Sequence, residues 1–171
     1  IDAATGLPNG WRRGVLADLI EQRLRTDREH RIKAVCVVHN ETSTGVTSDI
    51  VAVRRAIDAA GHPALLMVDT VSGLGSADYR HDEWGVDVSV AGSQKGLMMP
   101  PGLGFNALSP RALEANKHAR LPRAFWAWDE QVAMNQGGYF PTTPNTNGLY
   151  GLAEALEQLG PIVGADHRVR Q

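Results

Sequence analysis

The stretch IKAVCVVHNETSTGVTSDIVAVRRAIDAAGHPALLMVD, residues 32–69, decides the fold class. It begins and ends with apolar runs rich in β-branched residues, residues 32–39 and 64–69. Their nearly continuous hydrophobicity predicts strands that are covered on both faces. A helical pattern separates them, so this stretch is predicted to be a βαβ unit with two parallel strands. A third run of the same kind, VDVSVA, follows at residues 86–91.

Helical periodicity precedes, separates and follows these strands. Apolar residues recur every three or four positions in three groups: Leu16, Leu19, Ile20 and Leu24; Ile50, Val53, Ile57 and Ala60; Leu149, Leu152, Leu156 and Leu159. Ser48 or Asp49 can cap the second helix, Ser109-Pro110 opens a short helix through Leu113, and Gly160-Pro161 is predicted to end the last one. Strands alternating with helices predict an α/β fold, a mainly parallel sheet with flanking helices.

Composition and charge exclude several classes of function. The 171 residues carry a formal net charge of -2, from 17 basic and 19 acidic side chains. Basic runs with interleaved aromatic residues are absent, so we expect no nucleic-acid partner. Apolar segments of roughly 20 residues are also absent, so we expect no membrane span. The first ten residues lack the charged and apolar regions of a signal peptide, which predicts a cytoplasmic protein.

Two features are assigned to structure rather than to chemistry. Cys36 lies inside the apolar run AVCVV, and a lone thiol cannot form an internal disulfide, so it is predicted to be a small buried core residue. The segment Leu121 to Pro144 fits neither the helical nor the strand period, and it is either a long loop or an interface. Its aromatic side chains, like Trp84, are interpreted as packing residues.

Each of the three predicted strands runs into a polar cluster. The clusters are HNETSTG at residues 39–45, DTVSGLGS at residues 69–76 and GSQKG at residues 92–96. In open parallel sheets, ligands bind in the crevice beyond the carboxyl ends of the strands. The clusters are therefore expected to converge in space although they are distant in sequence.

A lysine and an aspartate at such a crevice point to a particular carbonyl chemistry. Lysine is an amine nucleophile that forms Schiff bases, including one with pyridoxal phosphate, and an aspartate often pairs with the pyridinium nitrogen of that cofactor. Lys95 and Asp69 are the residues in these positions. The amine of Lys95 must lose its proton before it can attack a carbonyl.

Other readings of the same residues stay open at this point. An isolated lysine in a loop is usually a solvated surface charge. Asp69 after an apolar strand could equally cap a helix or bind a metal, and residues 42–45, TSTG, could form a simple turn. Neither GxxxxGK[ST] nor GxGxxG occurs, which disfavours a nucleotide site. We expect no metal, because metal-ligand spacing is missing among His39, His62 and His81.

Three segments carry a family resemblance: VCVVHNETSTGV at residues 35–46, LMVDTVSGLGS at residues 66–76 and VAGSQKGLMMPPGLGF at residues 90–105. They closely resemble the serine-glyoxylate and alanine-glyoxylate aminotransferases of class V, within fold-type I of the pyridoxal phosphate enzymes. The resemblance covers about residues 32–159. Order and spacing agree as well, since Asp69 precedes Lys95 by 95 minus 69, or 26, positions.

The resemblance implies roles for five of these residues. Lys95 would hold pyridoxal 5'-phosphate as a Schiff base and then move the proton between the substrate α-carbon and C4′ of the cofactor. Asp69 would keep the pyridinium protonated. Val71, on the same side as Asp69 if the strand continues, would lie against the ring face. Thr42 would contact the side of the ring that carries the phenolic oxygen, and Gln94 would reach the phosphate.

The resemblance also implies partners. Thr143, in FPTTPNTNGLYGL, matches a residue that reaches the phosphate of the neighbouring subunit's cofactor, so a homodimer with its site at the subunit interface is expected. The substrates would be small amino acids and 2-oxo acids. The family's phosphate-binding loop would precede Ile1 and its small domain would follow Gln171. Residues 1–171 are therefore expected to be a partial large domain.

The leading hypothesis is amino transfer from serine or alanine to glyoxylate through Lys95. A second hypothesis is a truncated relative without catalytic activity. A third is a lyase or cysteine desulfurase of the same superfamily, since these share the aspartate and the lysine. Desulfurases need a mobile cysteine, and Cys36 in a strand cannot serve as one.

Overall fold

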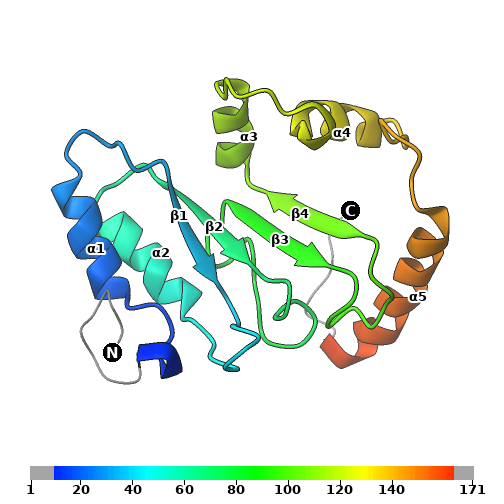
Figure 1. Ribbon diagram of the computed structural model, residues 1–171, viewed down its shortest axis with the longest axis horizontal. Coiled ribbons are helices and arrows are strands. Elements are labelled where there is room, and N and C mark those ends of the chain that lie inside the picture. The colour runs from blue at the N-terminus through cyan, green and yellow to red at the C-terminus, as the bar shows by residue number, and fades with distance from the viewer. Residues whose placement is uncertain (1–9, 164–171) are drawn as a thin grey trace.

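The computed structural model describes the backbone of residues 10–163 and the side chains of residues 10–160. Four strands pair side by side in the order β1-β2-β3-β4, with helices around them (Figure 1). The elements in chain order are η1 (Gly10–Arg12), α1 (Ala17–Thr26), β1 (Ala34–Val38), α2 (Ile50–Ala59), β2 (Leu65–Asp69), β3 (Val88–Gly92), β4 (Gly104–Leu108), α3 (Pro110–Lys117), η2 (Ala124–Trp126), α4 (Trp128–Gln136) and α5 (Thr146–Val163).

The strand register brings three strand ends to one edge of the sheet. β1, β2 and β3 are parallel, and Val38 of β1 pairs with Asp69 of β2, which pairs in turn with Val90 of β3. The predicted α/β fold with a mainly parallel sheet is confirmed. β4 was not foreseen: it pairs antiparallel with β3, because the turn over residues 93–103 is too short for a crossover helix.

The main core lies between one face of the sheet and the helices α1 and α2, which lie together beside β1 and β2 in Figure 1. Asp49 caps α2 by accepting a hydrogen bond from the Ala52 amide at 2.8 Å, as the sequence predicts. Side chains at helical spacing on α1 and α2 meet alternate residues of the strands. The buried cluster consists of Leu24, Val37, Ile50, Val53, Ile57, Leu66, Val68 and Val86.

The opposite face of the sheet is partly open within residues 10–160. Cys36 is exposed, and Val38 and Val90 keep 40% and 36% of their surface. The expectation of strands covered on both faces is therefore wrong for this part of the chain, as is the expected burial of Cys36. Side chains alternate along a strand, so Cys36 points away from the face on which its neighbour Val37 is buried.

Residues 121–144 form short helices rather than one long loop. The helices η2 and α4 occupy much of this segment, and Phe125 and Trp126 remain 70% and 78% exposed.

Two helix ends differ from the sequence prediction. Gly160-Pro161 does not end the last helix, because α5 continues to Val163. Ser109 caps α3 as predicted, although that helix extends to Lys117. Within residues 10–163, we find no helix that is both long and apolar enough to span a membrane.

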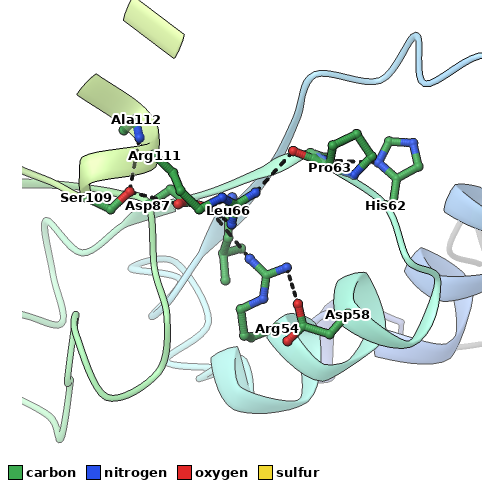
Figure 2. Close-up of polar contacts among 10 residues, drawn as sticks. Arg54, Asp58, His62, Pro63, Leu66, Asp87, Ser109, Arg111 and Ala112 are labelled. Atoms are coloured by element: carbon green, nitrogen blue, oxygen red, sulfur yellow. Dashed lines mark hydrogen bonds and ion pairs between the residues drawn. The ribbon is translucent and has the colours of Figure 1, made fainter. Parts of the chain in front are cut away.

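A buried carboxylate joins three elements at the amino end of the sheet (Figure 2). Asp87 is 2% exposed and accepts hydrogen bonds from the Leu66 amide at 2.9 Å and the Ser109 hydroxyl at 2.8 Å. Arg111 donates to it at 3.2 Å, and Nη1 of Arg54 lies 3.7 Å away. A buried charge is tolerated when partners surround it in this way. Asp87 thus joins β2, α2 and the start of α3.

Replacing Asp87 by alanine is expected to lower the free energy of unfolding by about 3 to 5 kcal/mol. The substitution would leave buried hydrogen-bond donors and the Arg54 and Arg111 cations without their carboxylate partner. Asp58→Ala is the matched control, since Asp58 also pairs with Arg54 but is 65% exposed. The control should change the free energy of unfolding by less than about 1 kcal/mol. Urea unfolding measures both, and equal effects of the two substitutions would contradict the role of Asp87.

Candidate active site

Polar loops follow β1, β2 and β3 at the carboxyl edge of the sheet. The first two, residues 39–47 and residues 70–76, are tied together by a side chain. The Ser72 hydroxyl donates to the carbonyl oxygen of Asn40 at 2.6 Å and lies 3.2 Å from its side-chain oxygen. The Asn40–Thr47 bridge closes the first loop on itself. The loop of Thr42 is therefore held at the same edge of the sheet as the loop that follows Asp69.

The second and third loops meet through two glycines. Gly75 has a φ of +75°, and a Cβ on it would lie 3.0 Å from the carbonyl carbon and oxygen of Gly96. A Cβ on Gly96 would lie 2.8 Å from the carbonyl carbon of Gly75 and would also collide with the carbonyl oxygen of Leu74. Backbone can approach backbone this closely only when both side chains are absent. The contact holds Lys95, next to Gly96, against the loop that follows Asp69.

Asp69 is the last residue of β2 and its side chain is exposed on the open face. One carboxylate oxygen accepts a hydrogen bond from the Val71 amide at 2.9 Å. Among the described residues, the other oxygen has no hydrogen-bond donor. The strand ends here, so Val71 lies half-buried in a turn and does not continue the strand. Its position beside Asp69 comes from an Asx-type turn.

Lys95 is the lysine that the fold places at this edge. Lys33 precedes β1 at the other end of the sheet and donates to the His30 carbonyl, and Lys117 pairs with Glu114 at the end of α3. Lys95 is exposed and lies in a tight turn, where its carbonyl oxygen accepts from the Met98 amide at 2.9 Å. Among the described residues, Nζ of Lys95 has no hydrogen-bond or ion-pair partner, so a free amine is available at this edge of the sheet.

Gln94 folds back over a glycine. A Cβ on Gly92 would lie 2.7 Å from the Oε1 atom of Gln94. Gly92 therefore leaves the space that the amide side chain occupies at the end of β3. The amide is exposed beside the Lys95 turn, where it can donate to an anion.

Thr42 and Thr143 are both exposed, and the loop that carries Thr42 is tied to the loop after Asp69 through Asn40 and Ser72. Thr42 lies in a turn closed by a 2.7 Å hydrogen bond from the Gly45 amide to the Glu41 carbonyl. Thr143 precedes α5, and a Cβ on Gly102 would lie 3.1 Å from Nδ2 of nearby Asn145. Within residues 10–160, no hydrogen bond joins Thr143 to the other five predicted site residues.

His39 lies buried beneath the Asp69 loop. Its ring is 2% exposed, packs edge-to-face on Trp84 at 6.0 Å and contacts Tyr79 at 5.1 Å. Its Nδ1 atom has no hydrogen-bond partner among the described residues and lies where a side chain on Gly73 would go. Burial lowers the pKa of His39, opposed by the charge of Asp78, so the ring stays neutral at neutral pH.

Comparison with known proteins decides the family. The aminotransferase class V family model matches residues 13–168. The chain belongs to the class V aminotransferases. Two curated relatives of this aminotransferase chain are a serine-glyoxylate aminotransferase of Methylorubrum extorquens, 56% identical over 85% of the chain, and an L-aspartate-glyoxylate aminotransferase of Paracoccus denitrificans, 51% identical over 87%. The chain spans 38% of the length of each.

A solved relative confirms the architecture of the class V fold. The alanine-glyoxylate aminotransferase of Nostoc sp. superposes with a TM-score of 0.70 at 33% identity. The match covers 87% of this chain and 39% of the Nostoc protein. The sheet and its flanking helices thus correspond to part of the fold of that aminotransferase.

The side chains at the sheet edge fit pyridoxal phosphate. The cofactor needs an amine for its aldehyde, an acceptor for its ring nitrogen and donors for its phosphate. Lys95 would supply the amine, the carboxylate oxygen of Asp69 that has no donor would be the acceptor, and Gln94 would be a donor. Gly92, which lacks a side chain, leaves room at the end of β3 for the Gln94 amide. These three side chains have the chemistry to bind the aldehyde, the ring nitrogen and part of the phosphate of the cofactor.

Several residues that shape the site were not selected from the sequence. Ser72, His39 and the glycine pair Gly75 and Gly96 tie or support the loops that carry Asp69 and Lys95. The repeated glycines of SGLGS and QKG are a signal for close backbone approach. The partner of each glycine, however, depends on tertiary contacts that a sequence pattern does not contain.

Gly75→Ala is expected to destabilise the protein more than Gly45→Ala. Both glycines have positive φ, +75° and +71°, so both substitutions incur the left-handed backbone penalty of about 1 to 2 kcal/mol. Gly45 has nothing within 4 Å of its added Cβ, whereas Gly75 meets the Gly96 backbone. Urea unfolding separates the two effects. Equal losses would show that the glycine contact contributes nothing beyond backbone strain.

Stability is expected to fall as the pH drops through 6.5. Burial lowers the pKa of His39 and of His81 below 6.5 in the folded state, so the unfolded chain takes up protons there that the folded chain does not. Each histidine adds a slope of up to about 1.4 kcal/mol per pH unit. His39→Gln should make the dependence between pH 7.5 and 5.5 shallower, as measured by urea unfolding. An unchanged slope would rule out a neutral buried His39.

Proposed function

We propose that this chain forms the central part of the large domain of a pyridoxal phosphate-dependent aminotransferase that transfers the amino group of serine or alanine to glyoxylate. The observation that carries the proposal is the Gly75–Gly96 contact, which ties the Lys95 turn to the Asp69 loop. The 56% identity to a serine-glyoxylate aminotransferase favours serine as the donor. The cytoplasmic location stays a prediction from the sequence.

Lys95 carries the central role in this proposal. When bound, pyridoxal phosphate withdraws electrons from the α-carbon of an amino acid joined to it. Nζ of Lys95 would hold the cofactor covalently. As a free amine, Lys95 would remove the proton from the substrate α-carbon and return it later, as a general base and acid. The exposed position of Lys95 at the sheet edge leaves room for both tasks.

Asp69 supports the reaction electrostatically. One of its carboxylate oxygens is held by the Val71 amide, which fixes the plane of the group and leaves the other oxygen available for the ring N–H. A charge-assisted hydrogen bond of this kind contributes about 1.5 to 3 kcal/mol. Val71 lies in the adjoining turn, where its side chain can cover the ring face.

Gln94 and Thr42 bind the periphery of the cofactor in this proposal. The Gln94 amide donates to the phosphate, and the Thr42 hydroxyl contacts the ring on the side of its phenolic oxygen. Both side chains are exposed, in the loops that follow β1 and β3. Their approach from two loops would fix the rotation of the ring over the sheet edge.

Thr143 is assigned to the site of a second copy of the chain. It is exposed, and it lies between the exposed Phe140 and the start of α5. The missing hydrogen bonds between Thr143 and the rest of the site within residues 10–160 fit a residue that serves the neighbouring cofactor. A homodimer that takes small amino acids and 2-oxo acids is therefore part of the proposal.

Asp69→Asn tests the proposed activity. The variant should still take up pyridoxal phosphate, while the half-reaction with serine slows about 10- to 100-fold, since a neutral amide no longer holds the ring nitrogen protonated. Stopped-flow absorbance of the cofactor measures this rate. Asp78→Asn is the control, because Asp78 is an exposed carboxylate in an ion pair with Arg80.

Wild-type rates in Asp69→Asn would remove Asp69 from the mechanism. The same assay run with cysteine separates the remaining alternative, because sulfide release from cysteine without amino transfer from serine or alanine would indicate a desulfurase. A protein that takes up no cofactor would support the non-catalytic relative.

A further inference from the structure

The lysine-bearing loop is closed at its base by one serine, Ser93. The Ser93 hydroxyl donates to the Pro100 carbonyl at 2.7 Å and accepts from the Leu103 amide at 3.2 Å. Its backbone N–H donates to the Leu103 carbonyl at 3.1 Å, and its carbonyl accepts from the Met99 amide at 3.2 Å. Every polar group of Ser93 is therefore bonded within the loop of residues 93–103.

Ser93 is fully buried, at 0% exposure, although Gln94 and Lys95 beside it are exposed. It therefore lies beneath the loop surface on which Gln94 and Lys95 are exposed. A hydroxyl that is buried with two good partners is a structural anchor, because leaving those partners unpaired is costly.

Helix α5 packs against the rest of the loop. Leu97 and Met99 are buried against Ala155 and Leu159 of that helix. Between these residues, Met98 adopts a φ of +57°, a left-handed conformation that non-glycine residues rarely take. Such a conformation persists only where the surroundings fix it. The Ser93 hydrogen bonds and the α5 contacts are the restraints on either side of it.

We propose that Ser93 is the positioning residue of Lys95: by closing the 93–103 loop, it fixes the direction from which the lysine Nζ reaches the cofactor. The inference rests on the proposed function of Lys95 and extends it to a residue that touches neither substrate nor cofactor. Small displacements of a reacting group reduce rates strongly, by up to about 100-fold for 1 Å. The loop closure therefore governs how fast the lysine captures the cofactor.

Ser93→Ala removes both side-chain hydrogen bonds and leaves the Leu103 amide and the Pro100 carbonyl without this partner. Ser89→Ala is the matched control. Ser89 lies on the same sequence segment four residues earlier, is 6% exposed, and also makes two hydrogen bonds, to Tyr79 at 2.5 Å and His81 at 2.7 Å. Its hydrogen bonds lie outside the loop of residues 93–103, so general destabilisation should be similar in the two variants.

Two measurements separate positioning from stability. Hydrogen exchange of a peptide covering residues 94–103, followed without cofactor, should be about tenfold faster in Ser93→Ala and unchanged in Ser89→Ala. The rate at which added pyridoxal phosphate becomes attached, followed by its visible absorbance, should fall about 10- to 100-fold in Ser93→Ala. Ser89→Ala should stay within about twofold of wild type.

The outcomes are distinct. If wild-type protein captures pyridoxal phosphate and Ser93→Ala captures it equally fast, the positioning role is overturned and the proposed function stands. If a full-length wild-type protein that contains this chain captures none, the proposed function fails and the positioning role fails with it. Ser93→Cys, which has a side chain of similar size and weaker hydrogen bonds, provides the same test should Ser93→Ala not fold, and its rate should lie between those of Ser93→Ala and wild type.

Discussion

The backbone contact between Gly75 and Gly96 is the constraint on which the rest of the site depends. The parallel register brings three loops to one edge of the sheet, but the register alone does not fix the positions of the loops relative to one another. The glycine contact fixes the loop after Asp69 against the turn of Lys95. A side chain at either glycine would push apart the loop that follows Asp69 and the turn that carries Lys95.

The two ends of the sheet are built in opposite ways. At the amino end, the charge of Asp87 is buried and surrounded by the partners shown in Figure 2. At the carboxyl end, Lys95 and Asp69 are exposed, and one carboxylate oxygen has no donor among the described residues. Charges that are satisfied stabilise a fold, whereas charges held in place with unused hydrogen-bonding capacity can bind a ligand. The sheet thus separates its stabilising polar cluster from its reactive one.

Local patterns in the sequence predicted much of this arrangement, and tertiary contacts explain what they missed. Apolar runs and helical spacing located β1, β2, β3, α1 and α2, and the cap at Asp49, because each depends on nearby residues. The antiparallel strand β4 and the exposure of Cys36 depend on how distant segments pack, which no local pattern records. Lys95 and Asp69 stood out by chemistry, whereas Ser93 looks like an ordinary loop serine until its four hydrogen bonds are seen.

The central claim is that Lys95 is the lysine that carries the cofactor, and its attachment site can be mapped directly. Borohydride reduction of the protein loaded with pyridoxal phosphate, followed by peptide mass spectrometry, reads out which amine is modified. The structure predicts the label on Lys95 alone, because Lys33 and Lys117 lie away from the sheet edge and bind other groups. A label on Lys33 or Lys117 in place of Lys95 would contradict the assigned site.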